Sequence, residues 1–236
     1  MVSHRHKAIF VHVPKAGGQS IETFFLNDLG LTRRTRTPLL LMPNPAPDVG
    51  PPRLAHLTAQ EYTRYHYVTE EQFDEYLTFA TVRDPWARAV STYKYLGYHN
   101  STTFRKFVER KLPVDLFDRM EYFVRPQFDY VAGSDGRVAV DHVLKLETLD
   151  ADFDVIREAL GLEGPLPHVN KSPPPRMGPS LRPRPMARYL RRQYLVARGL
   201  LPDHRDYREY YEPDLVERVA DLYRRDVEAF GYRFDG

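Results

Sequence analysis

The sequence predicts an α/β fold in which helices cover both faces of a central, mainly parallel sheet. Three observations support this: short apolar runs typical of buried strands, helical spacing of apolar residues after each run, and turns rich in glycine or proline between them. Alternation of strands with helices is typical of layered α/β folds with parallel strands. The strands are expected at residues 7–13, 77–82 and 142–146.

Each expected strand is followed by a segment with the start or stop signals of a helix. In residues 17–29 the apolar side chains recur at helical spacing and form one face. Pro85 suits the first turn of a helix that continues to about Tyr98. Asp150 can cap the helix after the third strand, and Gly161 can end it. Further helices are expected at residues 58–64, 70–75, 102–110, 116–123 and 213–230.

Length and composition bound the classes of protein that fit. The 236 residues favour a single domain over residues 1–236, with proline-rich loops at about 37–53 and 164–185. The formal net charge is only +2, so any anion binding must depend on local clusters. The chain has no cysteine, which excludes disulfides, thiolate nucleophiles and cysteine-based metal sites. Because no apolar run reaches the length of a membrane span and the start does not resemble a signal peptide, a cytoplasmic setting is expected.

The first candidate site is the turn between the strand at 7–13 and the helix after it. Gly17 and Gly18 allow backbone N–H groups to approach an anion, and the helix directs its positive end to the same place. Lys15 adds a full charge and Ser20 a hydroxyl. A Walker A loop places its lysine after the glycines, whereas Lys15 precedes them, so no Mg²⁺ is required. The pattern predicts a cradle for a phosphate-like anion; the alternative is a glycine-rich connector whose lysine is only solvated.

A second candidate site follows the strand at 77–82. Arg83 ends this strand, and Ser91 lies about two helical turns further on. Arginine suits bidentate recognition of a phosphate, to which a hydroxyl can contribute. The alternative is an ion pair between Arg83 and Asp84 that holds the start of the helix. Because ligands of such sheets bind at the carboxyl ends of the strands, one ligand with two separated anionic groups would explain both sites.

These two segments resemble the nucleotide-binding motifs of a known family. Residues 9–20, IFVHVPKAGGQS, are similar to the 5′-phosphosulfate loop of sulfotransferases that use 3′-phosphoadenosine-5′-phosphosulfate (PAPS). Residues 82–85, VRDP, together with Ser91 and Tyr93, resemble their 3′-phosphate motif. The similarity is greatest to the carbohydrate branch, which includes heparan sulfate 2-O-sulfotransferase. It also extends to residues 145–147, 168–172 and 223–232.

The resemblance implies a three-layer, P-loop-like fold and a defined reaction. A sulfuryl group would move from PAPS to the hydroxyl of an acceptor, a carbohydrate or a small molecule, by in-line displacement that needs no metal. Lys15 would stabilise charge on the leaving phosphate oxygen of the product, adenosine-3′,5′-bisphosphate (PAP). Family members often carry Thr or Ser where this chain has Ala16, Gly18 and Gln19, so backbone amides are expected to do more of the binding here. The implied cofactor-binding residues are Lys15, Ala16, Gly17, Gly18, Gln19, Ser20, Arg83, Ser91, Lys171 and Ser172.

The same resemblance implies a histidine as the base that deprotonates the acceptor. His56 follows the first proline-rich loop, and Tyr62 completes an H-x-x-x-x-x-[FY] pattern in which the carbohydrate branch carries its proposed base. Histidine suits this role near neutral pH. With Lys15, His56 is a candidate catalytic residue. The alternatives are His12, which has apolar neighbours, and Glu22, which also fits interaction with the helix dipole.

Arginine is concentrated late in the chain, between residues 176 and 198. This stretch is interpreted as a lid over the cofactor or as a site for an anionic acceptor such as a glycan; the alternative is a solvated helix face. A P-loop-type kinase or nucleotide-binding protein stays open as a function, as does a non-catalytic module that binds anions or nucleic acid. The net charge of +2 argues against a nucleic-acid partner. The residues indicate neither the acceptor nor the oligomeric state.

Overall fold

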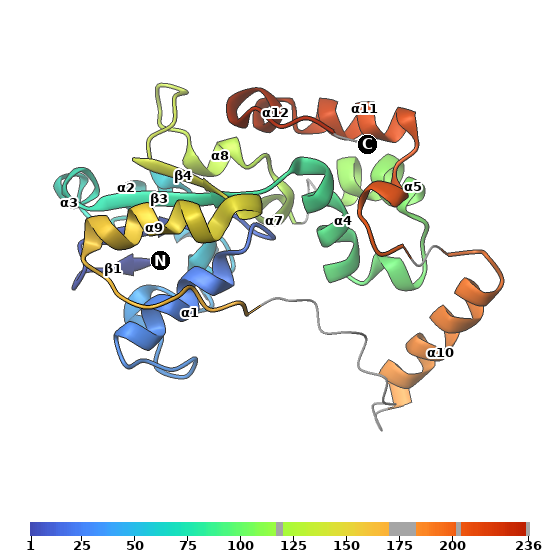
Figure 1. Ribbon diagram of the computed structural model, residues 1–236, viewed down its shortest axis with the longest axis horizontal. Helices are drawn as coiled ribbons and strands as arrows, with labels where there is room; N and C mark the ends of the chain where they lie inside the picture. Colours follow the sequence, from blue (N-terminus) through green and yellow to red (C-terminus); the bar gives the residue numbers. More distant parts are fainter. Residues whose placement is uncertain (117–119, 170–182, 202–203, 235–236) are drawn as a thin grey trace. The chain divides into compact units, whose positions relative to one another are not determined.

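The computed structural model describes the chain in two compact units. The first comprises Met1–Arg83 and Arg125–Lys171, and the second comprises Asp84–Val124 and Ser172–Gly236. Figure 1 shows their helices and strands, with labels where there is room. The expectation of a single domain over residues 1–236 stays a prediction. The structure describes residues 1–116, 120–169, 183–201 and 204–234.

A four-stranded sheet forms the middle layer of the first unit. β2 (Ala8–Val11), β3 (Leu77–Val82) and β4 (His142–Lys145) are parallel, and the short β1 (Val2–Ser3) pairs antiparallel with β2 at one edge. All four residues of β2 are buried, as is typical of a parallel strand covered on both faces. The predicted mainly parallel sheet is therefore confirmed. Because β2 and β3 are parallel neighbours, the segments that follow them begin at the same edge.

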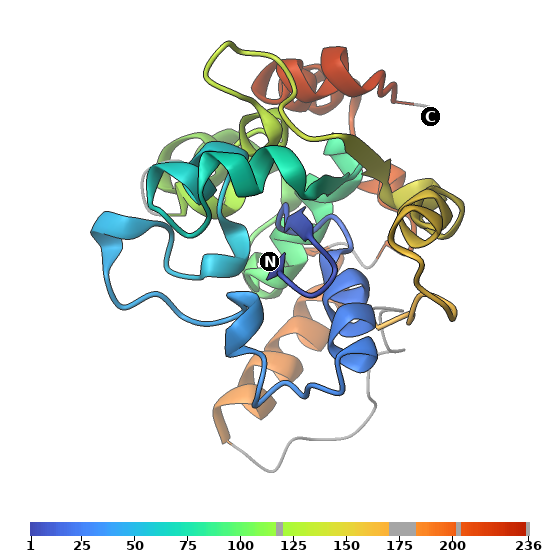
Figure 2. The same cartoon turned by 90° about the vertical axis from the view of Figure 1, so that its left-hand side faces the viewer.

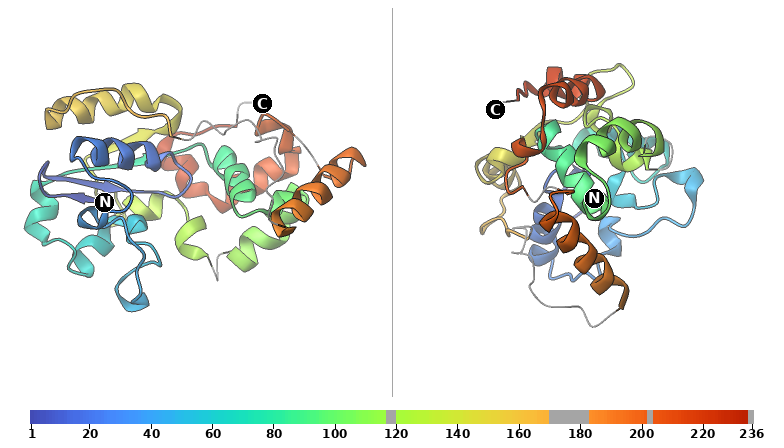
Figure 3. Two further views of the ribbon diagram at one scale, coloured as in Figure 1. Left: turned by 90° about the horizontal axis from the view of Figure 1, so that it is seen from below. Right: turned by 90° about the vertical axis from the view of Figure 1, so that its right-hand side faces the viewer.

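Helices cover both faces of this sheet and complete three layers. Figures 2 and 3 show α1 (Gly18–Asp28) and α9 (Leu149–Leu160) on one face and α2 (Ala59–Arg64) and α3 (Glu70–Glu75) on the other. The short α8 (Phe128–Val131) packs beside α2, where Gln60 Nε2 donates to the Ala132 carbonyl oxygen at 3.0 Å. The flanked, layered α/β fold predicted from the sequence is confirmed.

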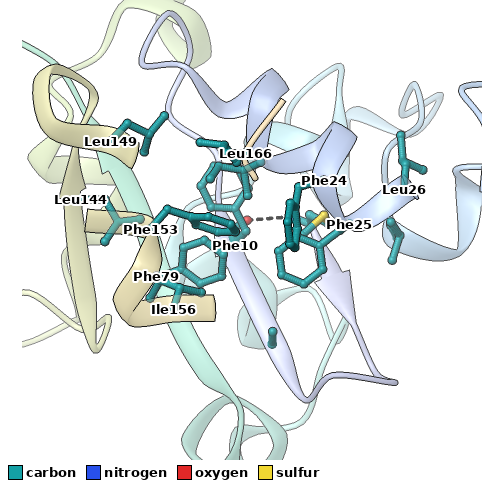
Figure 4. Packing of buried hydrophobic residues seen from close by; sticks show 14 of the residues in the cluster. Phe10, Phe24, Phe25, Leu26, Phe79, Leu144, Leu149, Phe153, Ile156 and Leu166 are labelled. Atoms are coloured by element: carbon teal, nitrogen blue, oxygen red, sulfur yellow. Dashed lines mark hydrogen bonds between the residues drawn. The ribbon is translucent and has the colours of Figure 1, made fainter. Parts of the chain in front are cut away.

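Aromatic side chains fill the layer between the sheet and α1 and α9 (Figure 4). Phe10 of β2 and Phe79 of β3 stack with ring centroids 5.1 Å apart. Phe24 of α1 and Phe153 of α9 meet edge to face at 5.0 Å. Burying each such ring contributes roughly 2–3 kcal/mol before the cost of ordering it. This packing fixes α1, and hence the turn that precedes it, against the sheet.

The helices expected at 58–64 and 70–75 are confirmed as α2 and α3. Thr58 and Thr69 each form a capping box, with Glu61 and Gln72 respectively. Gly161, with φ of 61°, ends α9. The expected cap of α9 is wrong by two residues.

Thr148, rather than Asp150, is the N-cap residue of α9. The 3-10 helix η6 (Leu146–Thr148) leads directly into α9, so Asp150 falls inside its first turn. Asp152 holds this start, because its Oδ2 accepts from the backbone N–H of Lys145 at 2.8 Å and from the Thr148 hydroxyl at 3.0 Å.

The first proline-rich loop has local order. It contains η1 (Thr37–Leu39) and η2 (Pro47–Val49), with an antiparallel bridge between Pro43 and Arg53. Leu39 and Leu41 join the core cluster of the first unit. The loop leads into η3 (Leu54–His56), so its anchored leucines help to fix the position of that turn.

The described part of the second unit is helical. Where the sequence predicts one helix over 102–110, the structure has the short α5 followed by η5. The segment η5 is a π-helix and contains Pro113. The expected helix at 213–230 is also wrong as a single helix, because it breaks at Tyr223. The helices are α4 (Pro85–Tyr95), η4 (Tyr98–Asn100), α5 (Phe104–Lys106), η5 (Phe107–Leu116), α7 (Glu121–Val124), α10 (Pro183–Ala197), η7 (Arg208–Tyr210), α11 (Pro213–Leu222) and α12 (Arg224–Phe230).

Candidate active site

The turn after β2 has the backbone geometry of an anion cradle. Lys15 (φ 67°) and Gly17 (φ 86°) both adopt the left-handed conformation, which reverses the chain within a few residues. Gly17 is the N-cap residue of α1, and it offers no side-chain acceptor to the first turn of the helix. An anion can therefore take the place of a cap and interact with the positive end of α1.

Gly18 is required by packing rather than by its backbone conformation. A Cβ atom at this position would lie 2.3 Å from Cδ2 of His12 and 2.4 Å from its Nε2. The His12 ring therefore lies directly against the start of α1. The same ring stacks on Phe10 at 5.5 Å between centroids, so it connects the cradle to the aromatic core.

Two cationic side chains of the first unit meet at this edge of the sheet. Arg83, which follows β3, donates from Nη1 to the backbone oxygen of Lys15 at 3.4 Å. Burial, together with the positive charge of Arg83, lowers the pKa of Lys15 from 10.5 to about 8. A bound anion would relieve this repulsion. Lysines whose pKa is lowered in this way are typical of sites that bind or stabilise negative charge.

The side chain of Gln127, which the sequence interpretation missed, holds the backbone of Arg83 from both sides. Its Oε1 accepts from the Arg83 N–H at 2.9 Å, and its Nε2 donates to the Arg83 carbonyl oxygen at 2.7 Å. Gln127 is fully buried, so these two bonds satisfy an amide that would be costly to bury alone. Nothing in the local sequence distinguishes this glutamine, because its partner lies 44 positions earlier.

His56 lies at the carboxyl end of β2, next to His12. Its Nδ1 is 3.0 Å from the His12 carbonyl oxygen, and the two rings meet edge to face at 4.8 Å. Because a carbonyl oxygen can only accept, Nδ1 carries the proton and Nε2 is the basic nitrogen. Burial, with the neighbouring His12 ring, lowers the pKa of His56 to about 3. The imidazole is therefore neutral at physiological pH, and it needs a nearby negative charge to accept a proton readily.

The two alternative bases form a buried pair beside His56. His12 Nδ1 and Glu22 Oε1 are 2.6 Å apart. Burial favours a raised pKa for Glu22, but the charge of His12 and its hydrogen bond outweigh burial and hold the pKa below its ordinary value. Glu22 is therefore an ionised carboxylate that is already engaged by His12.

The other sequence-predicted site residues are distributed over both units. Ala16 is buried, Ser20 is half-buried and Gln19 is exposed at the start of α1. Ser91 belongs to the second unit, half-buried on α4, where Asp84 caps the helix by accepting from the Ala87 N–H at 2.7 Å. Asp84 thus caps the start of this helix, a role that the alternative interpretation assigns to an ion pair between Arg83 and Asp84. Lys171 and Ser172 lie outside the described residues.

Only part of the arginine-rich stretch is described. Arg176 and Arg182 lie outside the described residues. Arg191 and Arg198 are exposed, and Arg192 is half-buried, in or next to α10. The choice between a lid and an acceptor site for this stretch stays open.

Two further findings concern metal binding and membrane insertion. Within the described ranges, no three or more His, Asp or Glu side chains come together in a way that could hold a metal ion. Within the same ranges, no helix combines the length and hydrophobicity that crossing a membrane requires.

Comparisons with known proteins assign the chain to a class. The family model described as "Sulfotransferase family" matches residues 1–233, which is nearly the whole chain. The chain therefore belongs to the sulfotransferase family and is a transferase of sulfuryl groups with a P-loop-like α/β fold.

Among individual proteins, the chain is similar to one from Archaeoglobus fulgidus whose description is "Uncharacterized protein". The two are 31% identical over 98 residues, which cover 40% of this chain and 76% of the archaeal protein. No solved structure matches the chain.

Proposed function

We propose that the protein transfers the sulfuryl group of PAPS to an acceptor hydroxyl. The observation that carries this proposal is the meeting of Lys15 and Arg83 in the first unit, beside an α1 start that glycine leaves without a side-chain cap. PAPS is an anion at both its 5′ and 3′ ends, and it needs a cation at each. Family membership supports the same donor, because sulfotransferases generally use PAPS.

The residues present fit this donor. The left-handed Gly17, and Gly18 with no room for a Cβ, allow the backbone of residues 16–20 to surround the 5′-phosphosulfate. Lys15 is positioned at the same turn to offset charge on the leaving phosphate oxygen. Arg83, whose backbone Gln127 fixes, suits the 3′-phosphate.

The reaction is an in-line displacement at sulfur. His56 Nε2 takes the proton of the acceptor hydroxyl while the acceptor oxygen bonds to sulfur. The bond between sulfur and the bridging phosphate oxygen breaks, and its electron pair leaves with PAP. As in phosphoryl transfer, positioning and electrostatic stabilisation supply most of the rate enhancement. We propose a carbohydrate or small-molecule hydroxyl as the acceptor, by resemblance to the carbohydrate branch.

Titration calorimetry with PAP, followed by a transfer assay with ³⁵S-labelled PAPS and a panel of hydroxyl acceptors, tests the function. We expect PAP to bind and Lys15→Ala and Arg83→Ala each to weaken binding or transfer at least about tenfold, since each removes a charged phosphate contact. His56→Ala should reduce turnover about 10²–10⁴-fold and spare PAP affinity.

Three outcomes would contradict the proposal or part of it. Absence of PAP binding at modest salt would overturn the choice of donor, and preference for ATP with Mg²⁺ over PAP would favour a kinase instead. Normal turnover in His56→Ala would eliminate His56 as the base. Arg64→Ala serves as the control, because Arg64 ends α2 away from the Lys15–Arg83 turn and should leave both readouts unchanged.

A further inference from the structure

Three side chains from distant parts of the sequence form a buried cluster at the end of β2. Glu22 comes from α1, His12 follows β2, and His56 ends η3. Glu22 Oε1 lies 2.6 Å from His12 Nδ1, and the His12 ring meets the edge of the His56 ring at 4.8 Å. His56 Nδ1 in turn donates to the His12 carbonyl oxygen at 3.0 Å. None of the three is more than 9% exposed.

Folding stability alone does not explain why these polar side chains are buried together. Glu22 lies on a helix whose neighbouring positions Ile21, Phe24 and Phe25 are buried and apolar. A buried carboxylate with a single imidazole partner is at best close to neutral for folding, and an apolar residue of similar volume often serves stability better. The position of Glu22 therefore points to a role in the chemistry next to it.

Glu22 can stabilise the positive charge that proton transfer creates on His56. When His56 takes a proton from the acceptor, a positive charge forms in a buried place, and burial opposes it. Of the groups that act on His56, the His12 ring and Arg53 disfavour this charge, whereas the hydrogen bond to the His12 carbonyl oxygen and the Glu22 carboxylate favour it. Two further groups adjoin Glu22: the α-amino group of Met1 and the Tyr62 phenol, which are hydrogen-bonded to each other.

We propose that Glu22 is a positioning residue for the base His56 and acts through His12. Its carboxylate holds the His12 ring, and the His12 ring and carbonyl oxygen hold His56 with Nε2 as the basic nitrogen. Its negative charge offsets the imidazolium that forms as the acceptor proton moves to His56 Nε2. This inference rests on the proposed function.

Geometry separates this role from two simpler ones. Glu22 is the fifth residue of α1, which begins at Gly18, so it lies beyond the first turn, where the helix dipole acts most strongly. Glu22 is also a poor choice for the base itself, because its carboxylate oxygen Oε1 is bound to His12.

Glu22→Gln tests the proposal, because glutamine keeps the size and the oxygen acceptor for His12 but removes the charge. We expect kcat to fall about 10–100-fold, the range found when partners that orient an active group are removed. KM for PAPS, the Kd of PAP and the melting temperature should stay close to wild type. A purely structural role would instead lower the melting temperature and weaken PAP binding together.

The matched control lies on the same helix. Asp28 Oδ2 at the end of α1 lies 2.9 Å from His6 Nε2, so Asp28→Asn likewise removes the charge from a carboxylate–histidine pair. It should leave kcat unchanged. If Glu22→Gln fails to fold, Glu22→Asp retains the charge at shorter reach and should keep most of kcat; a drop in kcat like that of His56→Ala would contradict the charge role.

An NMR measurement separates failure of this inference from failure of the proposed function. Long-range ¹H–¹⁵N spectra of the full chain should show His56 protonated on Nδ1 in the wild type, with a changed signal in Glu22→Gln and an unchanged one in Asp28→Asn. Wild-type kcat in Glu22→Gln, or His56 protonated on Nε2 in the wild type, would overturn the inference. Absence of PAP binding and transfer by the wild type would instead overturn the proposed function.

Discussion

Lys15 has an environment unlike that of a solvated side chain. It adopts a left-handed backbone conformation, which is usual for glycine. Its backbone oxygen accepts a hydrogen bond from the side chain of Arg83. Holding a lysine in this conformation costs of order 1 kcal/mol, and the proximity of a second cation adds repulsion. Strain and like charges of this kind accumulate where a ligand later compensates them.

Binding of PAP should therefore be coupled to proton uptake by Lys15. The free protein holds the Lys15 pKa at about 8, and a bound anion raises it, so above pH 8 a neutral amine becomes charged on binding. We expect uptake to increase as pH rises from 7 to 9 and affinity to fall over the same interval. Calorimetry in buffers of different ionisation enthalpy measures the uptake.

Lys15→Met provides the control for this coupling, because it removes the titrating group and retains much of the side-chain volume. Its weaker binding should show little dependence on pH in this interval. Equal proton uptake in the wild type and the variant would show that another group titrates.

At the scale of elements, the start of α1 is determined by contacts on both sides of the chain. Gly17 provides the left-handed turn, and Gly18 leaves room for the His12 ring. The glycines and the lysine could be predicted as a cradle from the sequence, because the conformation of a tight turn depends on residues that are adjacent in the chain. The role of His12 as the surface against which Gly18 packs could not, because that contact depends on the sheet.

Gly18→Ala should displace the His12 ring and impair the cradle. The added Cβ would lie 2.3 Å from His12 Cδ2, so the ring or the helix must move. Overpacking of this kind typically costs about 1–3 kcal/mol. We expect lower stability in urea, together with a loss of PAP affinity.

Gly30→Ala separates steric conflict from backbone strain. Gly30 lies just after the other end of α1, with φ of 64° and no atom within 4 Å of an added Cβ. This variant should lose about 1 kcal/mol of stability from strain and retain PAP affinity. Unchanged PAP binding in Gly18→Ala would contradict the tight packing of His12 against the cradle.

The break in the terminal helix could not be predicted from the spacing of its apolar residues. Leu215, Val219 and Tyr223 continue one apolar stripe, so the sequence predicts a single helix over 213–230. Tyr223 instead interrupts it, with its hydroxyl donating to the Val124 carbonyl oxygen at 3.0 Å and Arg88 over its ring at 5.6 Å. Such contacts join residues about a hundred or more positions apart and have no local signal.

At the scale of the whole molecule, the fold follows from short-range patterns, whereas the site depends on long-range ones. Strand–helix alternation is sufficient to predict the parallel sheet, and the parallel order brings the segments after β2 and β3 to one edge. The division into two units was not predicted, because the chain leaves the first unit at Arg83 and returns at Arg125 without a composition change. Gln127, which fixes Arg83, belongs to that return.

The charge of the whole chain predicts how the site responds to salt and to competing polyanions. With 34 basic and 32 acidic residues, the molecule lacks a large positive field, and anion binding depends on a few local cations. A protein that contacts many phosphates loses about 10³–10⁵-fold in affinity between roughly 50 and 200 mM salt. For PAP, with two anionic ends, we expect a loss of about tenfold or less over that range.

Competition titrations complete this test. Duplex DNA and single-stranded RNA should fail to displace PAP at about 150 mM salt, where charges more than about 8 Å apart are screened. Displacement by either polymer, with a steep salt dependence of its own binding, would favour a nucleic-acid-binding module and would assign the arginines at 176–198 to that partner. Retention of PAP in their presence would instead locate the anion specificity in the short-range geometry of Lys15, Arg83 and the start of α1.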